Sequence, residues 1–383
     1  MTARCRVLVL NERDPRHPQA GGAEVHVAEI SKRLDAMGFE ITQLACGFSG
    51  APRLERVDGM TVRRLGGLPR YYPRVPYWTA RATARGEFDV VVEHLNKVPF
   101  CAAAYSRAPV LAVNHHLFGR GAFVQVAWPI AVAVVSIEQL IPRIYREVPF
   151  LAVSESSKQD LVRRGIPAGH VGLLYNGIRC PTLEVKPIAD RPERIVYLGR
   201  LEAYKRIDLL LRAMTRLRER QPALELVIVG RGGERAALER QAHALGLAER
   251  VRFTGFVNVD ERDRLVADAR LAVCPSLKEG WGITVIEANA LGVPVVATDA
   301  PGLRDAVRDG ETGMLVPDGP PDVFVERLAG ALAELLGDTS RLAQLSAEAA
   351  VWARRFDWDV SAQRMVAALE AAVTGGPPVE RGG

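Results

Sequence analysis

Short apolar runs alternate with longer amphipathic segments along the first half of the chain. Residues 6–10 (RVLVL) predict a buried strand, and residues 21–38 predict a helix that places Val25, Ala28, Ile30 and Leu34 near one face and ends at Gly38. Further strands are expected at 39–46, 88–94, 108–114 and 149–154, with a capped helix at 155–165. Short strands between helices are typical of βαβ units, in which a parallel sheet is buried on both faces.

The alternation stops at residues 176–194, which contain three prolines and little periodicity and therefore predict a linker. It then resumes with expected helices at 206–220, 233–246 and 284–292. Strands are expected at 195–199, 224–230, 251–255, 271–276, 293–299 and 313–317. The sequence thus predicts two similar α/β domains, followed by an amphipathic C-terminal helix. Since ligands bind at the carboxyl ends of parallel strands, the two sheets should face a central cleft.

Length and composition agree with a soluble two-domain protein. The chain has 383 residues, 48% of them hydrophobic and 25% charged, and a formal net charge of +5. Its positive charges form no long basic block, so nucleic acid is not an expected partner. Five cysteines without a CxxC pair favour free thiols in a reducing compartment. The N-terminus lacks the apolar core of a secretory signal, which predicts a cytoplasmic protein.

Residues 126–135 (VAWPIAVAVV) are continuously apolar and include Pro129. Ten residues are too few for a membrane-spanning helix, which needs about 20. The stretch favours a buried helix or a domain wall. It also leaves open a peripheral contact of residues 123–135 with the inner face of a membrane.

The first segment with candidate chemistry follows the expected strand at 195–199. Gly199 allows the backbone to approach a ligand closely, and Arg200 and Lys205 flank a short loop before a helix. Two cations beside a helix N-terminus would suit a diphosphate. The alternative is an ordinary solvated, basic helix start.

The second segment is EGWGITVIE, residues 279–287. Thr284 is expected to cap the helix, so that amides near Gly282 point toward a bound phosphate. Glu279 and Glu287 could accept hydrogen bonds from vicinal sugar hydroxyls, one from a sugar and the other from a ribose. The alternative is a pair of surface glutamates.

Two other patterns are interpreted as structural. Gly230, Gly232 and Gly233 follow a strand and open a helix, but no acidic residue stands clearly at the dinucleotide-binding spacing, so they indicate a turn near a nucleotide. The Asp-Trp-Asp at 357–359 matches a metal-binding motif of another transferase fold. It precedes the C-terminal helix instead of ending a strand, so the sequence predicts no metal site.

Together, the segments GGAEVHVAEISKRL, GRLEAYKRIDLLLRA and EGWGITVIEANALG resemble the retaining family 4 glycosyltransferases of the GT-B fold, from about residue 5 to residue 370. The resemblance implies an acceptor-binding Rossmann-like domain at 1–178 and a nucleotide-sugar-binding one at 179–355. It also implies a helix at 356–374 that crosses back to the N-terminal domain. Residues 375–383 (GGPPVERGG) are expected to form a disordered tail.

The same resemblance implies roles for individual residues. Arg200 and Lys205 would bind the diphosphate, Glu279 the donor sugar and Glu287 the ribose. Other donor-binding positions would be Gly21, Gly22, Gly199, Val257, Gly280, Trp281, Gly282, Ile283 and Thr284. His115 would lie near the donor sugar. From their places at the ends of expected strands, His94, Asn96 and His116 are candidates for the acceptor side. Arg179 departs from the family, which commonly has an acidic residue there, and Trp281 stands where phenylalanine is commoner, with packing as its favoured role.

The resulting hypothesis is a metal-independent retaining hexosyltransferase. It would move a hexose from GDP-mannose or a UDP-hexose to an acceptor hydroxyl, in a lipid-linked or cell-envelope polysaccharide or on a small molecule. The nucleotide sugar would be a substrate, and no cofactor is expected. A non-catalytic nucleotide-binding module and a GT-B phosphorylase or epimerase are the alternatives.

Overall fold

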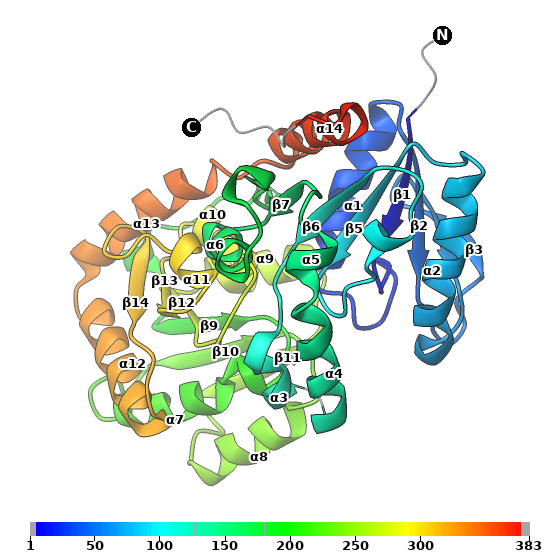
Figure 1. The fold of residues 1–383 in the computed structure, drawn as a ribbon. Coiled ribbons are helices and arrows are strands. Elements are labelled where there is room, and N and C mark those ends of the chain that lie inside the picture. Colours follow the sequence, from blue (N-terminus) through cyan, green and yellow to red (C-terminus); the bar gives the residue numbers. More distant parts are fainter. Residues whose placement is uncertain (1–4, 126, 180, 377–383) are drawn as a thin grey trace. The chain divides into compact units, whose positions relative to one another are not determined.

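The computed structural model describes residues 5–125, 127–179 and 181–376, and the chain divides into two compact units. One unit comprises residues 1–177 together with 357–383, and the other comprises residues 178–356. Each unit is a sheet packed with helices (Figure 1). The predicted architecture of two Rossmann-like α/β domains is therefore confirmed.

The N-terminal unit has an eight-stranded sheet in the order β3-β4-β2-β1-β5-β6-β7-β8. Its strands are β1 (Arg6–Leu10), β2 (Glu40–Ala45), β3 (Leu54–Val57), β4 (Met60–Arg64), β5 (Val90–Leu95), β6 (Val110–Asn114), β7 (Phe150–Ala152) and β8 (Val171–Leu173). All neighbours pair in parallel except β3 and β4. Asp58 and Gly59 join these two strands with positive φ angles of 49° and 79°, as a tight two-residue hairpin turn requires.

The helices of this unit are α1 (Gly22–Ala36), α2 (Leu68–Ala84), α3 (Ala122–Gln125), α4 (Trp128–Glu138), α5 (Ile141–Ile144), α6 (Glu155–Arg164) and α14 (Trp358–Thr374). The C-terminal helix α14 packs against α1. Gly177 permits this return of the chain, because a Cβ there would lie 2.3 Å from the backbone nitrogen of Trp358. Gly375 ends α14 in the left-handed conformation, and residues 377–383 lie outside the described part of the chain.

The C-terminal unit has a six-stranded, fully parallel sheet in the order β11-β10-β9-β12-β13-β14. Its strands are β9 (Arg194–Leu198), β10 (Glu225–Val229), β11 (Val251–Gly255), β12 (Leu271–Cys274), β13 (Val295–Thr298) and β14 (Gly313–Val316). Its helices are α7 (Ile207–Leu217), α8 (Arg235–Ala244), α9 (Val259–Ala267), α10 (Ile283–Ala290), α11 (Leu303–Ala306), α12 (Pro321–Leu336) and α13 (Thr339–Ala353). One apolar core packs this sheet against α7, α8, α12 and α13.

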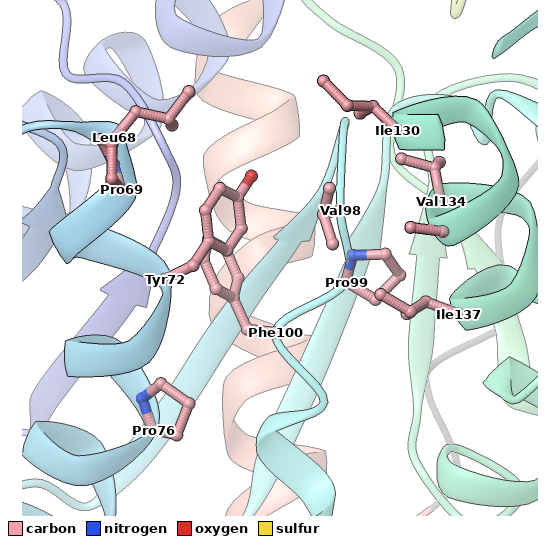
Figure 2. Close-up of a pocket in the computed structure, with 11 residues that line it drawn as sticks. Leu68, Pro69, Tyr72, Pro76, Val98, Pro99, Phe100, Ile130, Val134 and Ile137 are labelled. Atoms are coloured by element: carbon pink, nitrogen blue, oxygen red, sulfur yellow. The ribbon is translucent and has the colours of Figure 1, made fainter. Parts of the chain in front are cut away.

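Two expectations about apolar segments were wrong. Val25 is 45% exposed, and α1 instead buries Val27, Ala28, Ile30 and Leu34. The apolar stretch at 126–135, whose first residue lies outside the described chain, is not a buried helix. In α4 only Ala131, Val134 and Glu138 are buried, and Ile130, Ala133, Val134 and Ile137 line an apolar pocket together with α2 (Figure 2). No helix in the described residues is long and apolar enough to cross a bilayer.

Candidate functional site

The candidate donor residues gather where the strand order of the C-terminal sheet reverses. From β9 the chain builds outward to β10 and β11 on one side, and then returns to place β12, β13 and β14 on the other. In open parallel sheets the ligand site lies beside the carboxyl ends of the strands at such a reversal. Gly199 follows β9, and the loop that carries Glu279 follows β12, so the two predicted segments lie at this point.

The loops after β9 and β10 are packed so closely that only glycine fits between them. A Cβ on Gly230 would lie 1.9 Å from the carbonyl oxygen of Gly199, and one on Gly232 would lie 2.1 Å from that of Leu201. Gly199 itself has a φ of 151°, outside the range that side-chain-bearing residues adopt readily. The glycines at 230 and 232 therefore shape the loop beneath Arg200, which supports the structural interpretation of this turn.

Lys205 and Glu279 come together as an ion pair between the two loops. Their side chains are 11% and 16% exposed. Burial alone would lower the pKa of Lys205, but the attraction of the Glu279 carboxylate outweighs it and the pKa is raised. Lys205 is consequently a permanently charged ammonium, held at the strand ends by a carboxylate of the neighbouring loop.

Arg200 lies beside this pair and its side chain is exposed. Its Nη2 donates to the hydroxyl of Tyr204 at 3.0 Å. The backbone carbonyl of Tyr204 in turn accepts a hydrogen bond from the amide of Leu277, at 3.0 Å. The loop after β9 and the loop after β12 are thus joined through main chain as well as through the Lys205–Glu279 pair.

The EGWGI turn is anchored from the opposite side. The amide of Glu279 donates to the carbonyl of Pro301, and a Cβ on Gly302 would lie 2.3 Å from the carbonyl oxygen of Glu279. Gly282 has a φ of 78° and is the residue that begins α10. The expectation that Thr284 caps α10 was therefore wrong, because the left-handed turn at Gly282 starts the helix two residues earlier. Gly280, Ile283 and Thr284 are partly buried around this helix start.

Glu287 belongs to a chain of alternating charges that the sequence analysis did not find. Arg262 on α9 donates to Glu287 Oε1 at 2.8 Å and also to Asp263 Oδ1 at 2.8 and 2.9 Å. Arg179, which departs from the family pattern, donates to the other oxygen of Asp263 at 2.7 Å. The arginine at this position therefore has a local ion-pair partner. Burial raises the pKa of Glu287, and Arg262 opposes this effect only in part. Arg262 lies 25 residues from Glu287 along the chain, and no spacing rule connects the two.

The remaining donor-side candidates lie on the two flanking loops. Val257 is half-buried in the loop between β11 and α9. Its neighbour Phe256 is 74% exposed, with the guanidinium of Arg231 5.0 Å from its ring centroid. Such an exposed aromatic ring is a stacking surface that sequence reasoning missed. Trp281 is only 3% exposed and packs edge-on against Phe356 at 4.9 Å, in line with the favoured packing role.

The N-terminal sheet has an equivalent reversal between β1 and β5. Asn96, just after β5, donates to Asn11 Oδ1 at 2.9 Å, and Asn11 in turn reaches Glu24 at 3.4 Å. Glu24 accepts the amide of Gly21 at 2.6 Å. Gly21 and Gly22 are thereby fixed at the N-terminus of α1, which is a favourable place for an anion.

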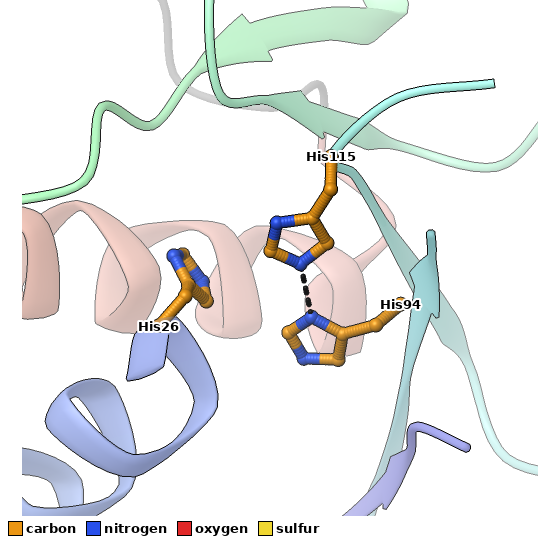
Figure 3. A group of neighbouring side chains, drawn as sticks. All are labelled: His26, His94 and His115. Atoms are coloured by element: carbon orange, nitrogen blue, oxygen red, sulfur yellow. Dashed lines mark hydrogen bonds between the residues drawn. The ribbon is translucent and has the colours of Figure 1, made fainter. Parts of the chain in front are cut away.

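His94 and His115 end neighbouring strands and form a buried group with His26 of α1 (Figure 3). His94 Nδ1 and His115 Nε2 are hydrogen-bonded at 2.9 Å, and His26 Nδ1 is hydrogen-bonded to Asn176 Oδ1 at 2.7 Å. Burial lowers the pKa of His26 to about 4 and lowers those of His94 and His115 well below the usual value. All three rings are therefore neutral near pH 7. His116 is half-buried, with its ring against Phe118.

This histidine group is the one set of three or more side chains, within the described residues, that could hold a metal ion. The relevant atoms lie within 4.8 Å of one another. Metal-bound imidazoles need metal–nitrogen distances of about 2.0–2.1 Å. The hydrogen bond between His94 Nδ1 and His115 Nε2 would have to break before both of these nitrogens could bind one ion. The Asp-Trp-Asp motif is used structurally, since Asp357 caps α14 and Asp359 pairs with Arg33 at 2.5 Å.

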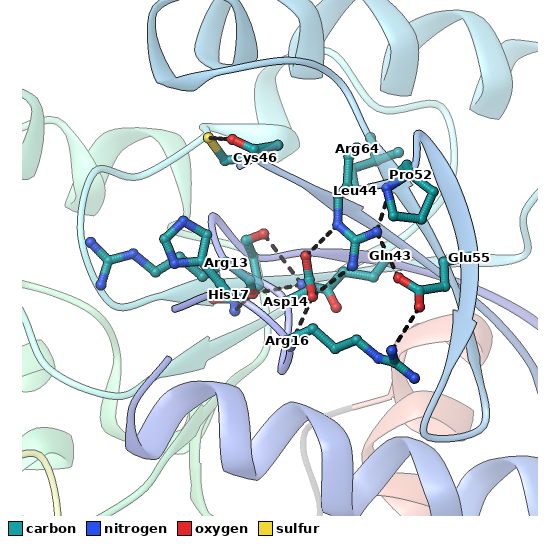
Figure 4. A network of polar contacts seen from close by, with 12 residues as sticks. Arg13, Asp14, Arg16, His17, Gln43, Leu44, Cys46, Pro52, Glu55 and Arg64 are labelled. Carbon is teal, nitrogen blue, oxygen red and sulfur yellow. Dashed lines mark hydrogen bonds and ion pairs between the residues drawn. The ribbon is translucent and has the colours of Figure 1, made fainter. Parts of the chain in front are cut away.

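A buried ion network shapes the loop between β1 and the glycines of α1 (Figure 4). Arg64 of β4 donates through two nitrogens to both oxygens of Asp14, at 2.8 and 2.9 Å, and through a third to Glu55 at 2.8 Å. The Arg64 and Asp14 side chains are 2% and 0% exposed. Breaking a buried pair of this kind typically costs about 3–5 kcal/mol. The Arg64–Asp14 pair therefore fixes the loop that leads from β1 to Gly21.

Comparison with known proteins identifies the class to which these features belong. Residues 20–180 match the family described as Glycosyltransferase Family 4, and residues 182–351 match the family described as Glycosyl transferases group 1. The chain is 31% identical to a D-inositol 3-phosphate glycosyltransferase of Salinispora tropica, with 90% of this chain and 80% of that protein covered. The protein therefore belongs to the family 4 glycosyltransferases.

A further relative agrees on this class, and solved structures share the fold. A phosphatidyl-myo-inositol mannosyltransferase of Mycobacterium leprae is 28% identical, over 94% of this chain and 96% of that protein. Sucrose-phosphate synthase from Thermosynechococcus elongatus has a TM-score of 0.79 at 22% identity, with 95% and 98% of the chains covered. HepE of Anabaena, solved with UDP and glucose, has a TM-score of 0.75 at 20% identity, with 96% and 100% covered. The fold is the GT-B fold of glycosyltransferases.

The histidine group predicts a loss of stability in mild acid. The unfolded chain binds a proton at His26 below its ordinary pKa of about 6.5, whereas the folded chain does so only near 4. Stability should therefore fall as the pH drops through this window, by about 2 kcal/mol between pH 7 and pH 5 from His26 alone. Urea unfolding at the two pH values should show a correspondingly smaller loss for His26→Gln.

His243→Gln is the matched control, since His243 is exposed on α8 and its replacement should leave the loss unchanged. An equal loss in wild type and His26→Gln would contradict the prediction.

Proposed function

We propose that this glycosyltransferase moves a hexose from a nucleoside-diphosphate sugar to an acceptor hydroxyl with retention of anomeric configuration. The observation that carries the proposal is the convergence of two cations, two carboxylates and one helix N-terminus at the strand-order reversal of the C-terminal sheet. GDP-mannose and a UDP-hexose are the donors considered. The relatives named as a mannosyltransferase and as an inositol-phosphate glycosyltransferase support a hexose donor and a polyol hydroxyl as acceptor.

In this proposal Arg200, Lys205 and the start of α10 stabilise the leaving diphosphate. Negative charge develops on that group as the glycosidic bond breaks, and donors that are already positioned need no reorganisation. Lys205 is suited to this role because Glu279 keeps it protonated. A diphosphate entering the site would share the ammonium, and the Glu279 carboxylate would become available for hydroxyls of the donor sugar.

The proposed attack occurs on the face from which the diphosphate leaves. The transition state should resemble an oxocarbenium ion. The departing phosphate would accept the proton of the acceptor hydroxyl, since we assign no protein carboxylate as a covalent nucleophile. His115 is neutral near pH 7 and would act as a hydrogen-bonding group near the donor sugar. No metal is included in the mechanism.

Glu287 is proposed to hold the ribose hydroxyls. It accepts a hydrogen bond from Arg262 through Oε1, which leaves Oε2 for a ribose hydroxyl. Val257 and its neighbour Phe256 would flank the base. Gly21 and Gly22 are proposed to contact the donor phosphate, and His94, Asn96 and His116 to lie toward the acceptor.

A nucleotide panel tests the diphosphate assignment. Calorimetry with UDP, GDP, ADP and dTDP should show binding of at least one, and Arg200→Ala should weaken it about 10- to 150-fold, the effect of losing a charge-assisted hydrogen bond. Arg240→Ala, at an exposed position of α8, should leave the affinity unchanged. Binding of none of the four nucleotides, or unaltered affinity in Arg200→Ala, would refute the assignment.

A comparison of the affinities for a ribonucleotide and for its 2′-deoxy form tests the proposed role of Glu287. Wild type should bind the preferred ribonucleotide more tightly than its 2′-deoxy form, because the missing hydroxyl leaves a carboxylate oxygen without its partner. In Glu287→Ala this preference should fall roughly tenfold, mainly because the ribonucleotide binds more weakly. The exposed Glu249→Ala is the control. The same ratio of affinities in wild type and Glu287→Ala would exclude contact with the 2′-hydroxyl.

Metal independence is tested by chelation. After dialysis against EDTA, release of nucleotide from the donor should continue at its original rate, and Mg²⁺, Mn²⁺ or Zn²⁺ should change it by less than about twofold, since protein cations stabilise the leaving group. Elemental analysis of the untreated protein should find no stoichiometric metal. Loss of activity that one divalent ion restores would contradict this part of the proposal. The group of His26, His94 and His115 would then be the first candidate for the metal site.

A further inference from the structure

An apolar groove lies in the N-terminal unit, on a part of the fold that the donor site does not use. It has a volume of about 560 Å³ and is lined by α2, by residues 98–100 and by α4. Figure 2 shows Tyr72 of α2 and Ile130 of α4 on its opposite walls. A groove of this volume is within the range that binds small ligands. Its lining contains no charged side chain, which favours an apolar occupant.

A partly buried ion pair adjoins this apolar groove. The hydroxyl of Tyr72, a lining residue, donates to Glu12 Oε2 at 2.7 Å, and Glu12 pairs with Lys97, which directly precedes the lining residue Val98. Glu12 follows β1 and Lys97 follows β5, so the pair lies at the strand-order reversal of this sheet. The Tyr72 hydroxyl and the Glu12–Lys97 pair therefore place polar groups next to the groove, at the strand-order reversal where the acceptor side is proposed.

The rim of the groove is apolar and exposed. Of the lining residues, Ile130 of α4 is 55% and Leu68 of α2 is 49% exposed; Trp128 and Tyr77, on the same two helices but outside the lining, are 70% and 67% exposed. Large apolar side chains gathered around a groove mark an interaction surface. Tryptophan and tyrosine are also the residues that settle where hydrocarbon meets water.

Helix α2 also carries exposed positive charge, at positions outside the groove lining. Arg70, Arg74 and Arg81 are exposed, and the sequence contains no acidic residue between Asp58 and Glu87. Long arginine side chains can lay their methylene groups on an apolar surface while the guanidinium stays in water. The charge complements an anionic group or an anionic lipid surface.

Two buried carboxylates hold the groove in shape. Glu93 accepts hydrogen bonds from the amides of Phe100 and Ala102, at 2.7 and 3.0 Å, and so fixes the segment that forms the groove floor. Glu138 of α4 accepts the amides of Phe118 and Gly119, at 2.7 and 2.9 Å. The groove is consequently preformed, which reduces the conformational entropy lost on binding.

We propose that this groove binds the hydrocarbon chain of a lipid-linked acceptor, whose polar head lies at the Glu12–Lys97 pair. The inference rests on the proposed transferase function and deepens it by assigning the acceptor class. An amphipathic chain matches both the apolar walls and the adjoining charges. Exposed arginines on α2 would meet the anionic head groups of the membrane from which the acceptor is drawn.

Calorimetry of the full-length protein with alkyl phosphates tests the groove. Dodecyl phosphate, kept below its critical micelle concentration, should bind, and decyl phosphate should bind about fifteenfold more weakly because two buried methylene groups are lost. Inorganic phosphate alone should show no comparable binding. Ala133→Trp should fill the groove and weaken dodecyl phosphate at least tenfold, since Ala133 lines it. Ser136→Trp, at an exposed position of α4 outside the lining, should have no effect.

Affinity that does not depend on chain length, or that Ala133→Trp leaves unchanged, would overturn the proposal. So would self-association that Ala133→Trp abolishes in a protein that binds no alkyl phosphate, because the groove would then be an interface between copies. Nucleotide binding is measured on the same variants and should survive Ala133→Trp. Alkyl phosphate binding without any nucleotide binding would support the lipid groove and refute the proposed donor chemistry, so the two failures are distinguishable.

Discussion

Parallel strands buried on both faces impose the constraint on which the rest of this structure depends. Every strand of the C-terminal sheet runs in the same direction, so all of its outgoing loops meet at one edge. Where the strand order reverses between β9 and β12, the loops diverge and leave room for a ligand. The apolar interiors of the strands thus decide where Arg200, Lys205 and Glu279 lie, although these residues contribute little to the core.

Buried charge is the second organising feature, and each case described here is compensated locally. Lys205 faces Glu279, Arg64 faces Asp14, and Glu93 accepts three backbone amides and the Tyr145 hydroxyl. Removing one member of such a set would leave a charge or a polar group without a partner, which is costly away from water. The Lys205–Glu279 pair is more exposed than the Arg64–Asp14 pair, at 11% and 16% against 2% and 0%, and in the proposed mechanism a diphosphate shares its ammonium.

Sequence patterns predicted the strands of the C-terminal sheet and the central strands of the N-terminal sheet, but missed β3, β4 and β8 at the edges of the N-terminal sheet. β1, β5, β9 and β12 are short apolar runs between helices, and such runs have few other stable environments. Helix α2 was not predicted, because Pro73 and Pro76 argue against a helix while its first turn tolerates Pro69. The hairpin of β3 and β4 was also missed, despite the Asp58-Gly59 pair that favours its turn.

For the candidate site, local motifs identified Gly199, Arg200, Lys205, Glu279 and Glu287, because loop glycines and charges after a strand have a readable chemical meaning. The family resemblance, and then the comparisons, established the class. The partners Arg262, Asp263 and His26 could not be found in this way, because they meet their neighbours across 25 to 150 residues. Only tertiary packing sets such distances. The sequence by itself determined the two α/β domains and the enzyme family, since periodicity and motifs are local. Tertiary structure alone decided which charges are paired, which histidines are neutral and where α4 stays exposed, because burial and pairing depend on the whole fold.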